Sequence, residues 1–333
     1  MFINWTINSE IYLENHEPVE IEPFIFQYKK FICKLNFVMD EFSSAIKDND
    51  GRSVMRINAV VFSLTSINDD DNTNIEILKE DESKLAKTIV SITNIFAKAV
   101  RLGGYCPLIH EIGLDSNNDY GTLFNKVGLM KSEGVKDGHP VVSFQTVANY
   151  GDMGEKYNII IGSGYLQLDV WNSVIKKAVV ESFLFPPERA FLVNSIEQRH
   201  LKNYRIGIIE ATIALEISLN KYLQSYLSHY KGLPKTRLDK FLGPDLGLYT
   251  RVNGLLILTL SEETISQIDL DSVLKFITWR NKIIHATGEI PDGLQDEVIE
   301  KSFANVINLI DFLSKTTERI ELSKQVKPEP TIS

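Results

Sequence analysis

Hydrophobic positions in the first half of the chain form runs of β-branched and aromatic residues that predict strands. Residues 54–67, VMRINAVVFSLTSI, are the clearest of these runs. Residues 141–148 and 157–171 read as further strands, with turn-forming glycines around them. The pattern therefore predicts β-structure in this half.

Two other stretches of the same half show helical spacing. Residues 80–102 begin with acidic residues and stop at Gly103-Gly104, as helices do, and residues 25–48 repeat apolar residues every three to four positions. The predicted buried stripes are Leu85, Ile89, Ile92, Phe96 and Val100 in the first, and Phe31, Leu35, Val38 and Phe42 in the second. We therefore expect residues 1–187 to form a mixed α+β domain. No family can be assigned to it, and we give it a sensor or regulatory role.

Phe185-Pro186-Pro187 marks a predicted domain boundary, because two consecutive prolines end the preceding element and favour an extended start to the next. Residues 188–320 then have an almost entirely helical pattern. A long helical run covers residues 195–227, and a shorter, glycine-interrupted one covers residues 238–260. The long run has one apolar face, made of Ile208, Thr212, Leu215, Leu219, Tyr222 and Tyr226.

Two further helices complete the second half. Asp269 or Asp271 caps the first of them, and Asp292 with Gln295 resembles a capping box for the second, over residues 293–319. Their predicted buried positions are Val273, Leu274, Ile277, Ile283 and Ile284 in the first, and Val298, Phe303, Val306, Ile310 and Leu313 in the second. The expected fold class is thus an α+β domain followed by an all-α bundle of four to five helices. Residues 321–333 are polar and contain prolines, so we expect a disordered tail.

Composition narrows the class of protein. The 333 residues are 44% hydrophobic and 24% charged, as in ordinary soluble proteins. The N-terminus does not read as a secretory signal, and no apolar run is long enough for a membrane helix. Only Cys33 and Cys106 are present, which argues against a disulfide framework and a cysteine-based zinc site. We expect a cytoplasmic protein with no membrane partner, no metal and no cofactor.

The net charge of −9 is unevenly distributed. Residues 1–187 hold 17 Lys and Arg against 25 Asp and Glu, whereas residues 188–333 hold 18 against 19. A broad basic surface for long nucleic acid is therefore not expected. A local pocket for a short single strand stays compatible with the nearly neutral second half.

The most distinctive chemistry lies in WRNKIIHATG, residues 279–288, at the end of a predicted helix. Arg280 can hold a phosphate with two parallel hydrogen bonds, and His285 exchanges a proton near neutral pH, while Asn281 can orient either group. These residue types suit metal-free attack of an RNA 2′-hydroxyl on its own phosphate. Positions five apart lie about 140° apart around a helix, so we expect the helix to end or loosen near Ile284.

Two segments carry a family resemblance: RNKIIH at residues 280–285 and YRIGIIEATIALEISLNKYL at residues 204–223. Over residues 188–320 the chain resembles HEPN domains, especially the ApeA-like subgroup. The RNKIIH segment fits the Arg-x(4–6)-His motif of this family. The resemblance implies a HEPN-like helical bundle and metal-independent RNA cleavage to 2′,3′-cyclic phosphate and 5′-hydroxyl ends. It also implies two protomers that pair through the helical domain, so that both motifs line one cleft.

The site residues follow from the same resemblance. It implies catalytic roles for Arg280, Asn281 and His285, and supporting roles for Lys282 and Glu210. Glu216 is a poorer candidate than Glu210 for the acidic residue. The implied substrate is single-stranded RNA, with structured loops or tRNA included. The implied biological role is a toxin or a phage-defence protein, in which an antitoxin or a phage trigger contacts the N-terminal domain.

Two other interpretations stay open. The HEPN fold can serve as a non-catalytic dimerisation or nucleotide-binding module, which the acidity of the chain favours. Alternatively, Arg280 and His285 are cations that stabilise the carbonyl end of their helix, and Glu210 is a solvated or ion-paired residue.

Overall fold

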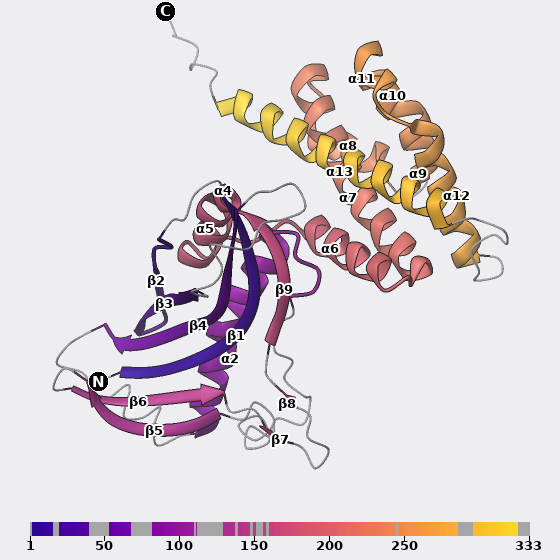
Figure 1. The fold of residues 1–333 in the computed structure, drawn as a ribbon. Helices are drawn as coiled ribbons and strands as arrows, with labels where there is room; N and C mark the ends of the chain where they lie inside the picture. The colour runs from indigo at the N-terminus through magenta and orange to yellow at the C-terminus, as the bar shows by residue number, and fades with distance from the viewer. Residues whose placement is uncertain are drawn as a thin grey trace, which may run out of the picture. The chain divides into compact units, whose positions relative to one another are not determined.

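The computed structural model describes residues 2–15, 20–39, 53–67, 82–109, 111, 129–136, 139–146, 149–150, 156–157, 160–243, 246–285 and 296–325. The chain divides into two compact units, residues 1–185 and residues 186–333. The first unit contains a curled mixed sheet with helices, and the second is mostly helical (Figure 1). An α+β region followed by a helical region is therefore what the chain forms.

Seven strands among the described residues form one sheet, in the order β2-β3-β4-β1-β6-β5, and β9 also pairs with β1. Their bounds are β1 (Phe2–Asn15), β2 (Phe24–Tyr28), β3 (Phe31–Met39), β4 (Ser53–Ser66), β5 (Leu129–Lys136), β6 (His139–Thr146) and β9 (Ile160–Gln167). β1 is antiparallel to β4 and parallel to both β6 and β9. A separate pair consists of β7 (Asn149–Tyr150) and β8 (Lys156–Tyr157). The predicted strands at residues 54–67 and 141–148 are confirmed as β4 and β6.

The long strand β1 was not predicted. Its pairing with β4 shifts register between Asn8 and Ile11, which marks a bulge or similar irregularity. The sequence signal for a strand was nevertheless present, because Ile3, Ile11 and Leu13 all lie at odd positions. All three are buried, as a strand face requires.

The helix predicted for residues 25–48 is wrong in its described part, because β2 and β3 form an antiparallel hairpin there. Residues four positions apart lie on one side of a helix and also on one side of a strand. Phe31 and Leu35 therefore fit both structures, and both are buried. Val38, at odd spacing from them, is 44% exposed, as the strand requires. Phe42 lies outside the described residues.

The helix predicted for residues 80–102 is confirmed as α2 (Glu82–Lys98) and the π-helical segment η2 (Ala99–Gly103). Its apolar stripe packs against one face of the sheet, where the Phe96 ring contacts Phe62 and Trp171, each at 6.1 Å between ring centroids. The strand predicted for residues 157–171 ends at Gln167. Helical segments α4 (Leu168–Val170), η3 (Trp171–Ile175) and α5 (Lys176–Val180) follow it and bury Trp171.

The described residues of the second unit are mostly helical. The helices are α6 (Pro187–His200), α7 (Tyr204–Lys231), α8 (Lys235–Phe241), α9 (Leu248–Thr250), the π-helical η4 (Arg251–Leu256), α10 (Ile257–Thr259), α11 (Glu262–Ser266), α12 (Leu270–His285) and α13 (Asp296–Gln325). α7 packs against α6, α12 and α13. The predicted run over residues 195–227 is two helices, because the turn at Leu201–Asn203, with Lys202 at a φ of 57°, ends α6.

The apolar face predicted for that run is buried at Ile208, Thr212, Leu215, Leu219 and Tyr222. In α13, Phe303, Val306, Ile310 and Leu313 are buried as expected, whereas Val298 is exposed and Ile299 is buried instead. α13 continues to Gln325, five residues past the predicted boundary at residue 320. The predicted capping box at Asp292 and Gln295 lies outside the described residues, as does the rest of the tail.

Candidate functional site

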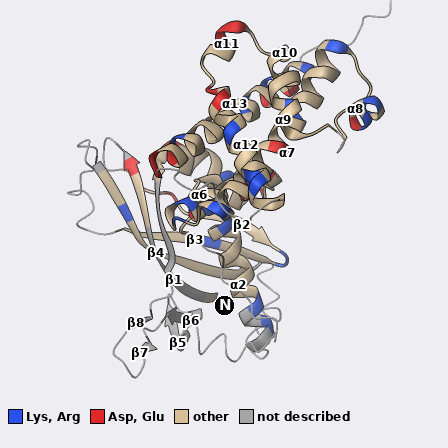
Figure 2. Cartoon of the chain, turned by 90° about the vertical axis from the view of Figure 1, so that its right-hand side faces the viewer, with Lys and Arg blue, Asp and Glu red and all other residues tan. Residues whose placement is uncertain are grey.

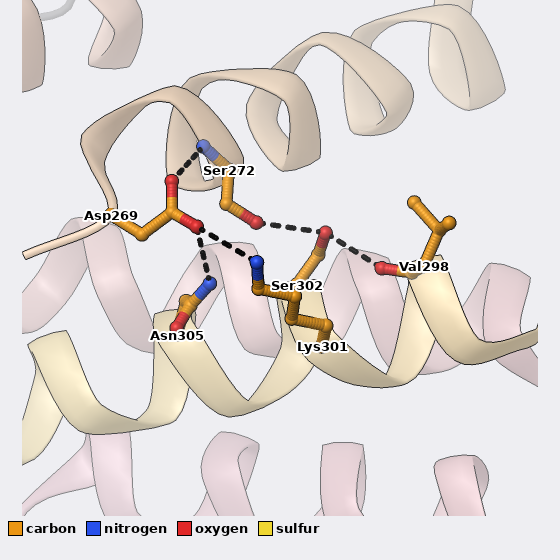
Figure 3. Close-up of polar contacts among 6 residues, drawn as sticks. All are labelled: Asp269, Ser272, Val298, Lys301, Ser302 and Asn305. Atoms are coloured by element: carbon orange, nitrogen blue, oxygen red, sulfur yellow. Dashed lines mark hydrogen bonds and ion pairs between the residues drawn. The ribbon is translucent and has the colours of Figure 1, made fainter.

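The helix that carries the RNKIIH segment begins at a well-bonded cap (Figure 3). Asp269 Oδ1 accepts a hydrogen bond from the backbone N–H of Ser272 at 3.0 Å, which identifies the cap among the two predicted carboxylates. Its Oδ2 accepts one from Asn305 at 3.2 Å and lies 3.7 Å from Lys301 Nζ. The hydroxyls of Ser272 and Ser302 are 3.0 Å apart. The first turn of α12 is thus fixed on α13.

The buried face of α12 holds its orientation in the helical unit. Phe276, Trp279 and Ile283 are buried, and the Phe276 ring meets Phe303 of α13 edge-on at 4.9 Å. Leu274 and Ile284 were predicted to be buried here, but Leu274 is only half-buried. Phe276 and Trp279 were not predicted. The signal was present, because residues 276, 279 and 283 follow helical spacing. Ile284 is 45% exposed.

The RNKIIH residues lie on the last turns of α12, next to that buried face. Asn281, Lys282 and His285 are exposed, and Arg280 is half-buried. Arg280 Nη1 donates a hydrogen bond to Asn281 Oδ1 at 3.1 Å. Arg280 Nε is buried and has no hydrogen-bond partner among the described residues. The structure therefore brings a guanidinium, an amide, an ammonium and an imidazole to one helix end.

The backbone positions of Arg280 and His285, the two residues most needed for cleavage, lie on different sides of α12. α12 is helical through His285, and the residues that follow lie outside the described part of the chain, so the predicted end or loosening near Ile284 stays a prediction. Arg280 and His285 therefore leave the helix about 140° apart, whereas Asn281 and His285, four positions apart, share a face. In a single protomer, Asn281 thus shares a face with His285 and also accepts the hydrogen bond from Arg280.

Glu210 has a hydrogen-bond partner outside the RNKIIH segment. It lies on α7, half-buried, where its carboxyl is hydrogen-bonded to Asn194 of α6. Burial raises the pKa of Glu210, and the hydrogen bond to Asn194 opposes that shift. Within the described residues, no hydrogen bond or ion pair joins Glu210 to Arg280, Asn281, Lys282 or His285.

Glu216, the second acidic candidate, has a structural partner. Its Oε1 lies 3.1 Å from Nη2 of the buried Arg251, which also donates to Asn220 Oδ1 and to the carbonyl of Leu246, each at 2.6 Å. These bonds hold η4 against α7. Glu216 therefore compensates a buried cation instead of facing the RNKIIH segment.

Metal and thiol chemistry find little support in the described part of the chain. It contains no group of three or more His, Cys, Asp or Glu side chains that could hold a metal ion. Cys33 and Cys106 are buried, and burial raises the pKa of each thiol to about 12, so both stay protonated at neutral pH. Across the same residues, no helix has both the length and the hydropathy needed to span a bilayer.

The end of α12 can bind a phosphate through Arg280 or Lys282 and can move one proton through His285. One chain supplies one His285, so two simultaneous proton transfers need two chains or a second group. No family model, curated protein or solved structure matches this chain.

Proposed function

We propose that this protein is a metal-independent endoribonuclease of the HEPN type, acting on single-stranded RNA as a homodimer. The observation that carries the proposal is the exposed end of α12, where Arg280, Asn281, Lys282 and His285 lie within two turns. In this proposal α6 to α13 form a HEPN-like bundle, and the toxin or phage-defence role belongs to the same hypothesis.

The reaction uses the sugar's own oxygen as the nucleophile. His285 of one protomer takes the proton of the 2′-hydroxyl, the O2′–P bond forms and the P–O5′ bond breaks. The protonated imidazole of His285 on a second copy gives its proton to the leaving 5′-oxygen. Arg280 stabilises the charge on the phosphoryl oxygens, and Asn281 holds the guanidinium through the bond they share. The products are a 2′,3′-cyclic phosphate and a 5′-hydroxyl.

The divergence of Arg280 and His285 on one helix favours a dimer in this proposal. A two-fold axis beside the ends of two α12 helices brings Arg280 of one copy toward His285 of the other. A phosphate on this axis then meets both His285 imidazoles and both Arg280 guanidiniums. Glu210 has no step in this scheme, and Lys282 adds attraction for the phosphate.

The test incubates the full-length protein with a fluorescent single-stranded RNA in EDTA. We expect cleavage by the wild type, a loss of about 10²–10³ in rate for Arg280→Ala, and about 10²–10⁴ for His285→Ala. Lys275→Ala, which removes an exposed cation from the same helix, serves as the matched control and keeps full activity. A 2′-deoxy substitution at the cleaved position blocks the cut.

Cleavage that requires a divalent metal, or that survives both Arg280→Ala and His285→Ala, contradicts the proposal. A second candidate, a non-catalytic nucleotide-binding or dimerisation module, then becomes the better one. The observation that favours it is that the Arg280 guanidinium is already bonded to Asn281. Nucleotide binding measured by calorimetry, with no loss of RNA over hours, identifies that module.

A further inference from the structure

The C-terminal end of α7 and the short helix α8 carry a dense group of cations in a chain of net charge −9. We call residues 229–241, HYKGLPKTRLDKF, the α7–α8 tip. Its one carboxylate is Asp239, and its exposed cations are Lys231, Lys235, Arg237 and Lys240. Figure 2 shows blue Lys and Arg segments on α8 beside a red carboxylate. None of the four cations forms an ion pair with another described residue.

The same tip exposes aromatic rings. Tyr230 is 57% exposed and Phe241 is 50% exposed, both high values for large apolar side chains. The Tyr230 ring is supported from behind by Tyr226, at 4.9 Å between centroids, and by His229, at 4.6 Å. Tyr226 in turn contacts the buried Tyr222 at 5.8 Å. The exposed ring thus stands at the end of an ordered aromatic row on α7.

The backbone of the tip is fixed. Gly232 ends α7 at a φ of 64°, and its N–H donates to the carbonyl of Leu227, a left-handed cap that glycine adopts without strain. Two residues later, the Pro234 carbonyl accepts the N–H of Leu238 at 3.1 Å, and the Leu238 side chain is buried. The cations and rings are therefore presented on a rigid frame, which lowers the entropic cost of binding.

This combination suits a single-stranded nucleic acid. A positively charged surface follows the phosphates, and exposed rings stack on unpaired bases. A membrane surface is a poorer fit, because a membrane-binding helix presents a continuous apolar face, whereas α8 buries Leu238 and exposes Phe241 among its cations. A base-paired duplex leaves no base free to stack on Tyr230 or Phe241.

We propose that the α7–α8 tip is a docking surface for single-stranded nucleic acid, distinct from the RNKIIH segment. The two lie near opposite ends of α7. Phe276 of α12 contacts Phe303, which contacts Tyr204, the first residue of α7, whereas the tip begins at its last turn. A helix of 28 residues spans about 42 Å. The tip binds phosphates through its cations and stacks bases on its rings. It therefore binds single strands of DNA and RNA alike.

This inference deepens the proposed function, because it names where a strand is held away from the cleavage site. Its test uses oligothymidylate, which has no 2′-hydroxyl and cannot be cleaved by the proposed reaction. Loss of DNA binding and loss of RNA cleavage are therefore measured separately. If the protein does not bind DNA, the proposed RNA cleavage is unaffected, and if it does not cleave RNA, the proposed DNA-binding surface is unaffected.

The experiment follows fluorescence anisotropy of labelled oligothymidylate with the full-length protein at several salt concentrations. We expect the double variant Lys235→Ala with Arg237→Ala to bind about tenfold more weakly at low salt, with a salt slope smaller by about 0.7 for each lost phosphate contact. The matched control, Lys98→Ala with Lys275→Ala, removes the same charge from exposed positions elsewhere and binds as the wild type does.

The rings are tested at the same time. Tyr230→Ala is expected to weaken binding about tenfold, because a stacked base is lost, while Tyr230→Phe retains binding. Tyr249→Ala, at another exposed tyrosine, is the matched control. Equal losses in the tip and control variants overturn the proposal, as does the absence of any binding by the wild type. Binding to vesicles of anionic phospholipid with none to oligothymidylate also overturns it and assigns the tip to membranes.

Discussion

The carboxyl group of Glu210 is half-buried on α7, and that burial raises its pKa. A raised pKa means that the folded protein disfavours the ionised form. The stabilising contribution is then fully present below the unfolded-state pKa of about 4.3 and is lost as the pH rises through the higher folded-state value. At neutral pH the Glu210 carboxylate therefore lowers the stability of the fold.

Replacing Glu210 by Gln removes this penalty and keeps the hydrogen-bonding shape. We expect Glu210→Gln to unfold at a higher temperature than the wild type at pH 7, with the difference vanishing near pH 4. Circular dichroism of the helical signal measures it, with the exposed Glu263→Gln as control. A difference that grows toward pH 4 contradicts this reasoning. An activity loss in the same variant assigns Glu210 a part in cleavage that its contacts do not suggest.

At the scale of single elements, α12 is fixed at both ends of its buried face, by the Asp269 cap and by packing of Phe276 and Trp279. The cap also ties α12 to α13 through Asn305 and Lys301. The direction in which the RNKIIH residues point thus depends on interactions three to four turns away.

Removal of the cap is expected to destabilise this arrangement. Asp269→Ala should lower the free energy of unfolding by about 1 kcal/mol, within a range of about 0.5–2 kcal/mol, because a backbone N–H and two side chains lose their acceptor. Asp271→Ala removes an exposed carboxylate from the same first turn and should cost only a few tenths of a kcal/mol. Urea unfolding measures both. Equal effects would show that Asp269 is not the cap in solution.

The hairpin of β2 and β3 shows why one element was predicted wrongly. Phe31 and Leu35 are four positions apart. Residues at this spacing lie on one side of a strand and also on one side of a helix, so the pair could not distinguish the two structures. Cys33 between them is buried and Lys34 is exposed, which is the alternation of a strand. The alternation of apolar and polar residues at these neighbouring positions was the sequence signal for the strand.

At the scale of the whole molecule, the chain combines an acidic α+β unit with a nearly neutral helical unit that holds both proposed nucleic-acid sites. If the helical unit cleaves cellular RNA, expression of the full chain should stop growth. We expect arrest on induction in bacteria, relieved by His285→Ala and unchanged in Lys275→Ala. Cell density after induction measures it. Harmless wild-type expression, or equal arrest by His285→Ala, counts against a toxin role.

The sequence by itself determined the features that depend on local periodicity and on residue chemistry. These are the division near Phe185, the strand β4, the helix α2, the apolar face of α7 and the presence of Arg280, Asn281 and His285 at one helix end. Each can be read from neighbours a few positions apart, because side-chain spacing and proline geometry act locally.

Only the tertiary structure decided the features that depend on distant partners. β1 takes its place in the sheet because β4, β6 and β9 satisfy its backbone groups. Glu216 is bonded to Arg251 and Glu210 to Asn194, both partners outside the RNKIIH segment. α12 stays helical through His285, so Arg280 and His285 start from different sides of the helix. Burial and pairing of this kind arise between segments far apart in the chain, where spacing carries no signal.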